Sequence, residues 1–279
     1  MTKRVKIGIV APSSRLDPAT AERVATLATE RHPEAELHFH PQCHLSCGHF
    51  AGDDAARAAA FAEVANDPSF DALWFGRGGY GSARIAEAVL PMLTAAARRK
   101  LYLGYSDAGA LLAALYAAGF PGLAHGPMPA DIRRKGGEAA VARALDWLVR
   151  RAPGALEPSL SAGGQAAAFN LMTFSQLIGT PLEPDLAGHV LMLEEVDEHM
   201  YRIDRSMFHL TSHRPLRRLA GIKLGRCSAI PPNDPDFGLN EVEIAEHWCK
   251  VSGIPFLGRA DIGHDPENKV VPFGAAAGA

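Results

Sequence analysis

A serine stands where a predicted strand gives way to a predicted helix. The segment Leu101-Tyr-Leu-Gly-Tyr-Ser-Asp-Ala-Gly-Ala110 has the pattern of a strand that breaks at Ser106 and of a helix that begins at Asp107. Free N–H groups at the positive end of a helix stabilise a developing oxyanion, so Ser106 is a candidate nucleophile. The segment lacks the second glycine of G-x-S-x-G, because Ala108 occupies that place. Simple capping of the helix by Ser106 is an equally good interpretation.

A glycine-rich segment follows the preceding predicted strand. Gly76, Gly78 and Gly81 fit the pattern G-x-G-x-x-G between a strand and a helix, which is typical of dinucleotide sites. That fingerprint belongs in the first strand–helix unit, where this chain has Ala11-Pro-Ser13, and no acidic residue ends the next strand to hold a ribose. A nucleotide-binding oxidoreductase is therefore the weaker alternative. The glycines can equally expose N–H groups for an oxyanion hole or form a tight turn.

A catalytic serine needs a base, and the base needs an acid that orients it. Among twelve histidines, His264 lies between turn-forming residues after an apolar stretch, which predicts a loop position. Glu194 and Glu195 end the apolar strand predicted at 190–193, and either could be the acid. Adjacent strand residues point to opposite faces, so the sequence leaves that choice open. A solvent-exposed loop histidine without a role is the plainer alternative.

A second group of reactive residues lies between positions 38 and 49. It contains His38, His40, Cys43, His44, Cys47 and His49. Such residues could bind zinc, but their spacing fits no standard finger. We expect a polar strand end and loop there, without a metal, and leave metal binding open.

Composition limits the function classes. The chain has 279 residues, 47% hydrophobic and 21% charged, with a formal net charge of −3. A core of useful size is therefore expected, and neither a nucleic acid nor an anionic membrane is favoured as a partner. Four cysteines without a secretory signal indicate reduced thiols, so we expect a cytoplasmic location. No apolar run approaches the length of a membrane span.

The order of predicted elements indicates an α/β fold. Strands at 5–10, 36–39, 71–75 and 101–105 alternate with helices at 18–30, 53–66, 82–97 and 107–118. This alternation predicts a Rossmann-like parallel sheet domain over residues 1–150, whose site lies beyond the carboxyl ends of its strands. Residues 151–164 are rich in Pro, Gly, Ser and Ala, which indicates a linker.

The second predicted domain, residues 165–279, is smaller. Strands are expected at 190–193 and 219–224, with helices at 170–178, 203–211 and 241–252. The last helix has clear limits, because Asn240 can cap it, Glu243 completes a capping box and Gly253 follows its end. The alternation appears less regular than in the first part, so we expect a mixed, β-rich domain. The glycine and alanine tail at 274–279 predicts disorder.

Several of these motifs, taken in order, resemble those of the LD-carboxypeptidases. They are Phe50-Ala-Gly-Asp53 with Arg57, Arg77-Gly-Gly-Tyr-Gly81, Gly104-Tyr-Ser-Asp107, His125-Gly-Pro127, Ile178-Gly-Thr-Pro181, Leu193-Glu-Glu195, Tyr201-Arg-Ile-Asp-Arg205 and Gly263-His264. That family includes muramoyl-tetrapeptide carboxypeptidase and the microcin C self-immunity peptidase. The resemblance covers nearly the whole chain.

The resemblance implies a serine peptidase with a triad of Ser106, Glu194 and His264. It also implies an oxyanion hole from the N–H groups of Gly79 and Asp107. The substrate class would be a murein tetrapeptide that loses its terminal D-alanine in cell-wall recycling. No metal or organic cofactor is expected, and the family's usual state is a homodimer. A peptidase for peptidyl-nucleotides or other toxic amides is the alternative within the same chemistry.

Overall fold

The first sheet carries the amino-terminal half of the chain. The computed structural model describes residues 4–162 and 164–275. Its six-stranded sheet has the order β10-β5-β4-β3-β1-β2, and every neighbouring pair among β1 to β5 is parallel. The strands are β1 (Val5–Val10), β2 (Ala35–Phe39), β3 (Ala72–Phe75), β4 (Leu101–Gly104), β5 (Leu123–His125) and the late β10 (Val271–Pro272).

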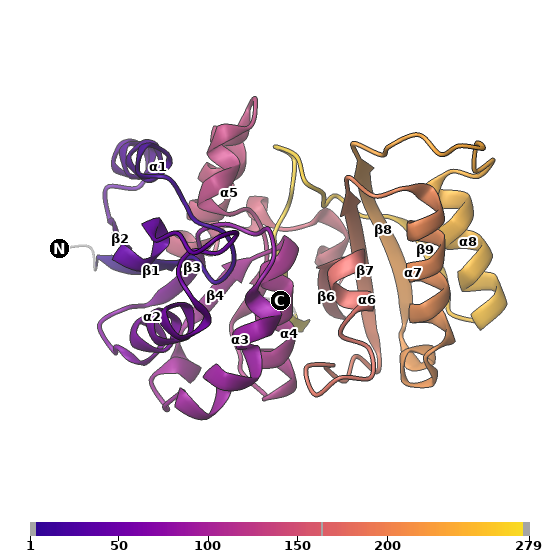
Figure 1. Ribbon diagram of the computed structural model, residues 1–279, viewed down its shortest axis with the longest axis horizontal. Coiled ribbons are helices and arrows are strands. Elements are labelled where there is room, and N and C mark those ends of the chain that lie inside the picture. Colours follow the sequence, from indigo (N-terminus) through magenta and orange to yellow (C-terminus); the bar gives the residue numbers. More distant parts are fainter. Residues whose placement is uncertain (1–3, 163, 276–279) are drawn as a thin grey trace.

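Helices cover both faces of this sheet, as Figure 1 shows. They are α1 (Pro18–Arg31), α2 (Asp54–Asn66), α3 (Ser82–Val89), α4 (Gly109–Ala117) and α5 (Gly137–Arg150). Buried side chains of α1 and α5 pack on one face, and those of α2, α3 and α4 pack on the other. The predicted α/β class with a Rossmann-like first domain is therefore confirmed. In such sheets the ligand site lies beyond the carboxyl ends of the strands.

One helix is shorter than predicted. The helix expected at 82–97 ends as α3 at Val89, and short 3-10 turns follow at Leu90–Met92 and Ala97–Arg99. Pro91 explains the early end, because proline has no N–H to donate to the carbonyl four residues earlier and its ring crowds that carbonyl. The turns bring the chain back to β4.

The second domain is more regular than its sequence pattern indicated. It runs β6 (Gln165–Asn170), α6 (Leu171–Ser175), β7 (His189–Val196), α7 (Met200–Ser212), β8 (Gly221–Ser228), α8 (Glu241–Ser252) and β9 (Phe256–Arg259). These four strands are parallel, in the order β6-β7-β8-β9. The expectation of irregular alternation was wrong, because the sequence pattern had not predicted the strands β6 and β9. The limits and capping box of α8 agree with the prediction.

The two domains share a continuous apolar core. Residues of α3 and α4 belong to the same buried cluster as Phe169 on β6, Leu193 on β7 and Leu210 on α7. Within residues 151–164, the predicted linker, the chain forms 3-10 turns at Pro153–Ala155 and Pro158–Ala162, and Ala155 and Leu160 are buried. The domains are thus packed together rather than tethered.

The end of the described chain crosses back to the first domain. After the loop that carries His264, β10 pairs antiparallel with β5 of the first sheet. The next strand, β11 (Gly274–Ala275), pairs antiparallel with β6, so this part of the tail is ordered although its composition predicted disorder. Residues 276–279 lie outside the described residues. This crossing fixes the His264 loop between the two sheets.

Candidate active site

Ser106 occupies a strained turn at the end of β4. It begins the 3-10 turn Ser106–Ala108, which leads into α4, and its φ of 58° lies in the left-handed region. A non-glycine residue there stores backbone strain, and such positions occur at sharp strand–helix turns that present a nucleophile. A Cβ placed on Gly78 would lie 2.8 Å from Ser106 Oγ, so only glycine lets the loop after β3 approach the hydroxyl this closely.

Asp107 ties three loops together beneath this turn. Its buried carboxylate accepts hydrogen bonds from the Ser13 hydroxyl, after β1, and from the Ser82 N–H at 2.8 Å, at the start of α3. The Ser82 hydroxyl donates to the Asp107 carbonyl. Sequence reasoning missed this role. The adjacency of Asp107 to a candidate nucleophile was the only local signal.

Arg57 fixes the same loops from the other side. Its side chain is fully buried, and Nη1 donates to the carbonyls of Pro12 and, at 2.8 Å, Gly81. Its guanidinium also lies 4.7 Å from the centroid of the Phe50 ring. The Phe50 and Arg57 motif therefore holds the glycine-rich loop in shape.

Glu194, not Glu195, faces the histidine. Glu194 Oε2 lies 2.6 Å from Nδ1 of His264, and both side chains are buried. Glu195 points the other way and accepts hydrogen bonds from Asn170 Nδ2 at 2.6 Å and from the N–H of Met172 at 2.8 Å, which secures the start of α6. Burial, with the Glu194 charge as a smaller cause, raises the pKa of Glu195 to about 7.

The His264 loop is held from both domains. Arg226 of β8 makes ion pairs with Asp261, at 2.5 Å, and with Asp265. From the first domain, Arg143 of α5 donates from Nη1 to the carbonyls of Pro266, at 2.8 Å, and Asn268, at 2.9 Å. The loop position predicted for this histidine is confirmed, but the loop is strongly tied rather than free.

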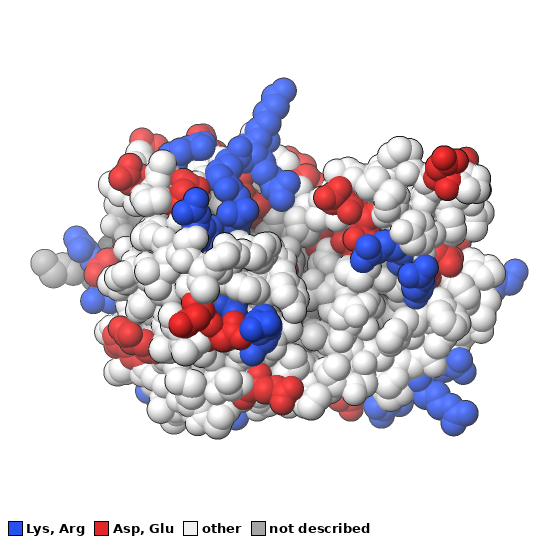
Figure 2. Space-filling view, in the orientation of Figure 1, with Lys and Arg blue, Asp and Glu red and all other residues white. Residues whose placement is uncertain are grey.

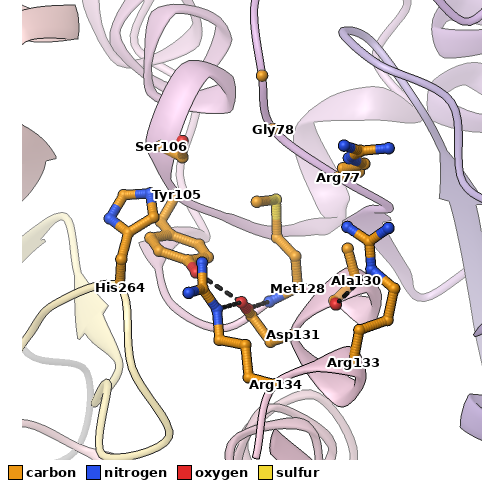
Figure 3. Close-up of a pocket in the computed structure, with 11 residues that line it drawn as sticks. Arg77, Gly78, Tyr105, Ser106, Met128, Ala130, Asp131, Arg133, Arg134 and His264 are labelled. Carbon is orange, nitrogen blue, oxygen red and sulfur yellow. Dashed lines mark hydrogen bonds and ion pairs between the residues drawn. The ribbon is translucent and has the colours of Figure 1, made fainter. Parts of the chain in front are cut away.

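The electrostatic surroundings of His264 favour its protonated form. Burial by itself lowers the pKa of the imidazole, but the Glu194 carboxylate outweighs burial and holds the pKa above the usual 6.5. Since Nδ1 faces Glu194, Nε2 is the ring nitrogen left to act as a base. Figure 3 shows that edge of the imidazole turned toward Ser106. The structure thus pairs the imidazole with the Glu194 carboxylate and places it with Ser106 at one pocket.

Ser106 and His264 line one pocket of about 480 Å³. Tyr105 also lines it, with its ring centroid 4.7 Å from that of His264. The remaining lining comes from Gly78 and Gly79 and from the segment around the 3-10 turn Pro129–Arg133. The other lining side chains are Arg77, Met128, Ala130, Asp131, Arg133 and Arg134.

The predicted oxyanion residues both lie at this site. Gly79 lines the pocket, and Asp107 directly follows Ser106. The glycines of the G-x-G-x-x-G pattern are closely approached by protein side chains: a Cβ on Gly79 would lie 2.3 Å from Ser14 Oγ, and one on Gly81 would lie 2.8 Å from Arg57 Nη1. Side chains of the protein itself thus occupy the space beside these glycines, where a dinucleotide phosphate would have to lie.

The histidines and cysteines between 38 and 49 have separate structural partners. Cys43 is buried against the Ile9 carbonyl, and burial raises the pKa of its thiol to about 12. His40 Nδ1 accepts from the Gln42 N–H at 3.1 Å, and His44 Nδ1 lies 2.8 Å from the Leu16 carbonyl. Among residues 4–162 and 164–275, the side chains form no group of three that could hold a metal ion.

The fold and this site define a class: a two-domain α/β protein whose candidate nucleophile and base come from different domains. Family models of the LD-carboxypeptidase N-terminal and C-terminal domains match residues 7–126 and 163–278. A putative carboxypeptidase of Synechocystis is 30% identical over 87% of this chain and 80% of its own. The murein tetrapeptide carboxypeptidase of Pseudomonas aeruginosa is 26% identical over 98% of this chain and 92% of its own. The chain belongs to the LD-carboxypeptidase family.

Solved structures agree on the fold. Muramoyltetrapeptide carboxypeptidase from Oxalobacter formigenes superposes with a TM-score of 0.79 at 23% identity, covering 96% of this chain and 93% of that one. The microcin C7 self immunity protein MccF, in complex with aspartyl sulfamoyl adenosine, superposes with a TM-score of 0.80 at 19% identity, covering 98% and 92%. No helix in the described part of the chain has the length and apolar character of a membrane span.

Proposed function

We propose that this carboxypeptidase removes the terminal D-alanine of murein tetrapeptides, with Ser106 as nucleophile, His264 as base and Glu194 as orienting acid. The observation that carries the proposal is the Glu194–His264 hydrogen bond of 2.6 Å beside the strained Ser106 turn. Relatives named as murein peptide carboxypeptidases support the substrate class.

The proposed reaction is acyl transfer in two halves. Nε2 of His264 takes the Ser106 proton while Oγ forms a bond to the carbonyl carbon, and the N–H groups of Gly79 and Asp107 donate to the oxyanion. His264 then gives the proton to the leaving amine as the C–N bond breaks. Water, activated by the same imidazole, hydrolyses the ester and restores Ser106.

The alternative substrate, a peptidyl-nucleotide, has weaker support. MccF is related in fold, and its complexes contain aminoacyl sulfamoyl nucleosides. A base-stacking platform is expected for such a ligand. Trp74 and Trp147 are buried, Trp248 packs beside Phe208, and in the described chain no tryptophan lines the pocket. We therefore propose the tetrapeptide, rather than a peptidyl-nucleotide, as the substrate.

The test is incubation of the purified protein with a muropeptide tetrapeptide, followed by mass spectrometry for loss of one alanine. We expect release by the parent protein and a loss of at least about 10⁴-fold in kcat for Ser106→Ala and His264→Ala. A parent that releases nothing from any such peptide would refute the substrate proposal. Equal release by parent and variants would refute the site.

The proposal includes a cytoplasmic homodimer, as the family resemblance implies. Light scattering on the purified protein tests the dimer, and a monomer mass at micromolar concentration would contradict it. Fractionation of cells that express the protein tests its location, and recovery with secreted proteins would contradict a cytoplasmic enzyme.

A further inference from the structure

The pocket has more positive than negative charge. Arg77, Arg133 and Arg134 line it, and Asp131 is the one carboxylate among its lining residues in the described chain. Asp131 is buried and already engaged, because its oxygens accept from the Tyr105 hydroxyl at 2.6 Å and from the Met128 N–H at 2.8 Å. A ligand therefore meets the cations and not the anion, and an anionic ligand is favoured.

Two of the arginines have little negative charge close to their guanidinium groups. Arg77 donates from Nη1 to the Arg15 carbonyl, and burial together with the nearby charge of Arg133 lowers the pKa of Arg77. The nearest carboxylate to Arg133 is Asp17 at 3.8 Å, and Asp17 is also occupied as the cap of α1. Figure 2 shows Lys and Arg side chains gathered on the upper part of the first domain, beside the hollow between the domains.

Arg134 differs from these two because it is anchored. Its Nε lies 3.1 Å from Oδ1 of Asp131, the oxygen that also accepts from Tyr105. The Tyr105 hydroxyl also interacts with this guanidinium. The Arg134 side chain is nevertheless 40% exposed, so its terminal nitrogens remain accessible to a second, bidentate partner. In Figure 3 the Arg134 guanidinium extends toward Tyr105 and His264, whereas Arg77 and Arg133 lie on the opposite side of the pocket.

We propose that Arg134 binds the terminal carboxylate of the substrate and so makes the enzyme cut only the last residue of a peptide. The inference rests on the proposed function, in which His264 protonates the leaving amine. In the leaving amino acid the carboxylate carbon is about 2.5 Å from that nitrogen, as the N–Cα and Cα–C bonds dictate. The carboxylate must therefore lie beside His264, where Arg134 is the arginine held in place. A longer peptide holds its carboxylate farther from the scissile bond, and an amidated peptide has no such charge. In both cases Arg134 keeps only its Asp131 partner.

The experiment compares a tetrapeptide with its C-terminal amide in the parent, Arg134→Gln, Arg134→Lys and Arg133→Gln proteins. We expect the parent to prefer the free acid and Arg134→Gln to lose about 100-fold in kcat/KM for the acid but little for the amide. Arg134→Lys should recover part of the preference, because it keeps the charge but not the bidentate geometry. Arg133→Gln, across the pocket, should keep the acid-to-amide ratio of the parent.

An unchanged acid-to-amide ratio in a folded Arg134→Gln protein would overturn the proposal, as would loss of the ratio in Arg133→Gln alone. Circular dichroism checks folding. If the parent releases no D-alanine at all, the proposed function fails, and calorimetric titration with the two peptides still decides the carboxylate question. Tighter binding of the acid that depends on Arg134 would support the inference, and equal binding would overturn it.

Discussion

The loop edges of the two domains are held in different ways. Around Ser106, buried hydrogen bonds from neutral donors to the Asp107 carboxylate, which is 6% exposed, join three loops. Around His264, ion pairs fix the loop from partly exposed side chains, 31% for Arg226 and 26% for Asp265. Buried polar bonds leave unpaired groups when one partner is removed, whereas exposed ion pairs can be replaced by water. The position of the nucleophile therefore depends on the buried hydrogen bonds of its domain. The position of the base depends more on the ion pairs of its loop and on Glu194.

The largest expected effect separates the two adjacent glutamates. Glu194→Gln should lower kcat by about 10⁴-fold, because the imidazole loses the carboxylate that orients it and stabilises its charge. Glu195→Gln is the matched control, since that side chain is equally buried but bonds to Asn170 and Met172. We expect it to change kcat less than tenfold. Steady-state release of D-alanine measures both, and equal losses would contradict the assignment of Glu194.

Elements in both domains could be predicted where their signals are local. The strand at 5–10 and the helix at 241–252 were predicted with correct limits, since apolar runs, the Asn240 cap and Gly253 are readable without the fold. The error in α3 came from passing over Pro91, a local signal. In contrast, β6 contains Ala166 to Ala168, a run with no strong strand preference, and becomes a strand because β7 and β11 pair with it.

The candidate site was less predictable from residues alone. Glu194 and His264 are 70 positions apart, so no spacing rule joins them, and only the family resemblance implied the pair. The choice between Glu194 and Glu195 required the three-dimensional structure of the sheet. Strand alternation predicts that the two side chains point to opposite faces, but not which of them faces the base. Arg134 and Arg143 gave no sequence signal, because arginine is common at the protein surface and no neighbouring residue marks these two as different.

A smaller effect compares the two loop edges in stability. Asp107→Ala should lower the free energy of unfolding by about 3 kcal/mol, because it leaves the buried Ser82 N–H and Ser13 hydroxyl without an acceptor. Asp265→Ala removes a partly exposed ion pair of Arg226 and should cost less than about 1 kcal/mol. Urea unfolding of both variants tests the difference. Losses of the same size would show that the two edges are held alike.

The smallest expected effect is a shift in pH dependence. A base must be neutral to accept the serine proton, so kcat/KM should fall as pH decreases through the pKa of His264, which lies above 6.5. Folding stability changes with pH in the opposite direction. The charged pair of His264 with Glu194 stabilises the fold fully below pH 6.5, and this stabilisation is lost as the pH rises through the raised pKa of His264. In Glu194→Gln, burial acts unopposed by that carboxylate and should move the pKa down. NMR titration of the His264 ring in the Ser106→Ala protein, with and without Glu194→Gln, measures the shift. A pKa that stays the same or rises would mean that Glu194 does not control the charge of the base, whatever its position beside Nδ1.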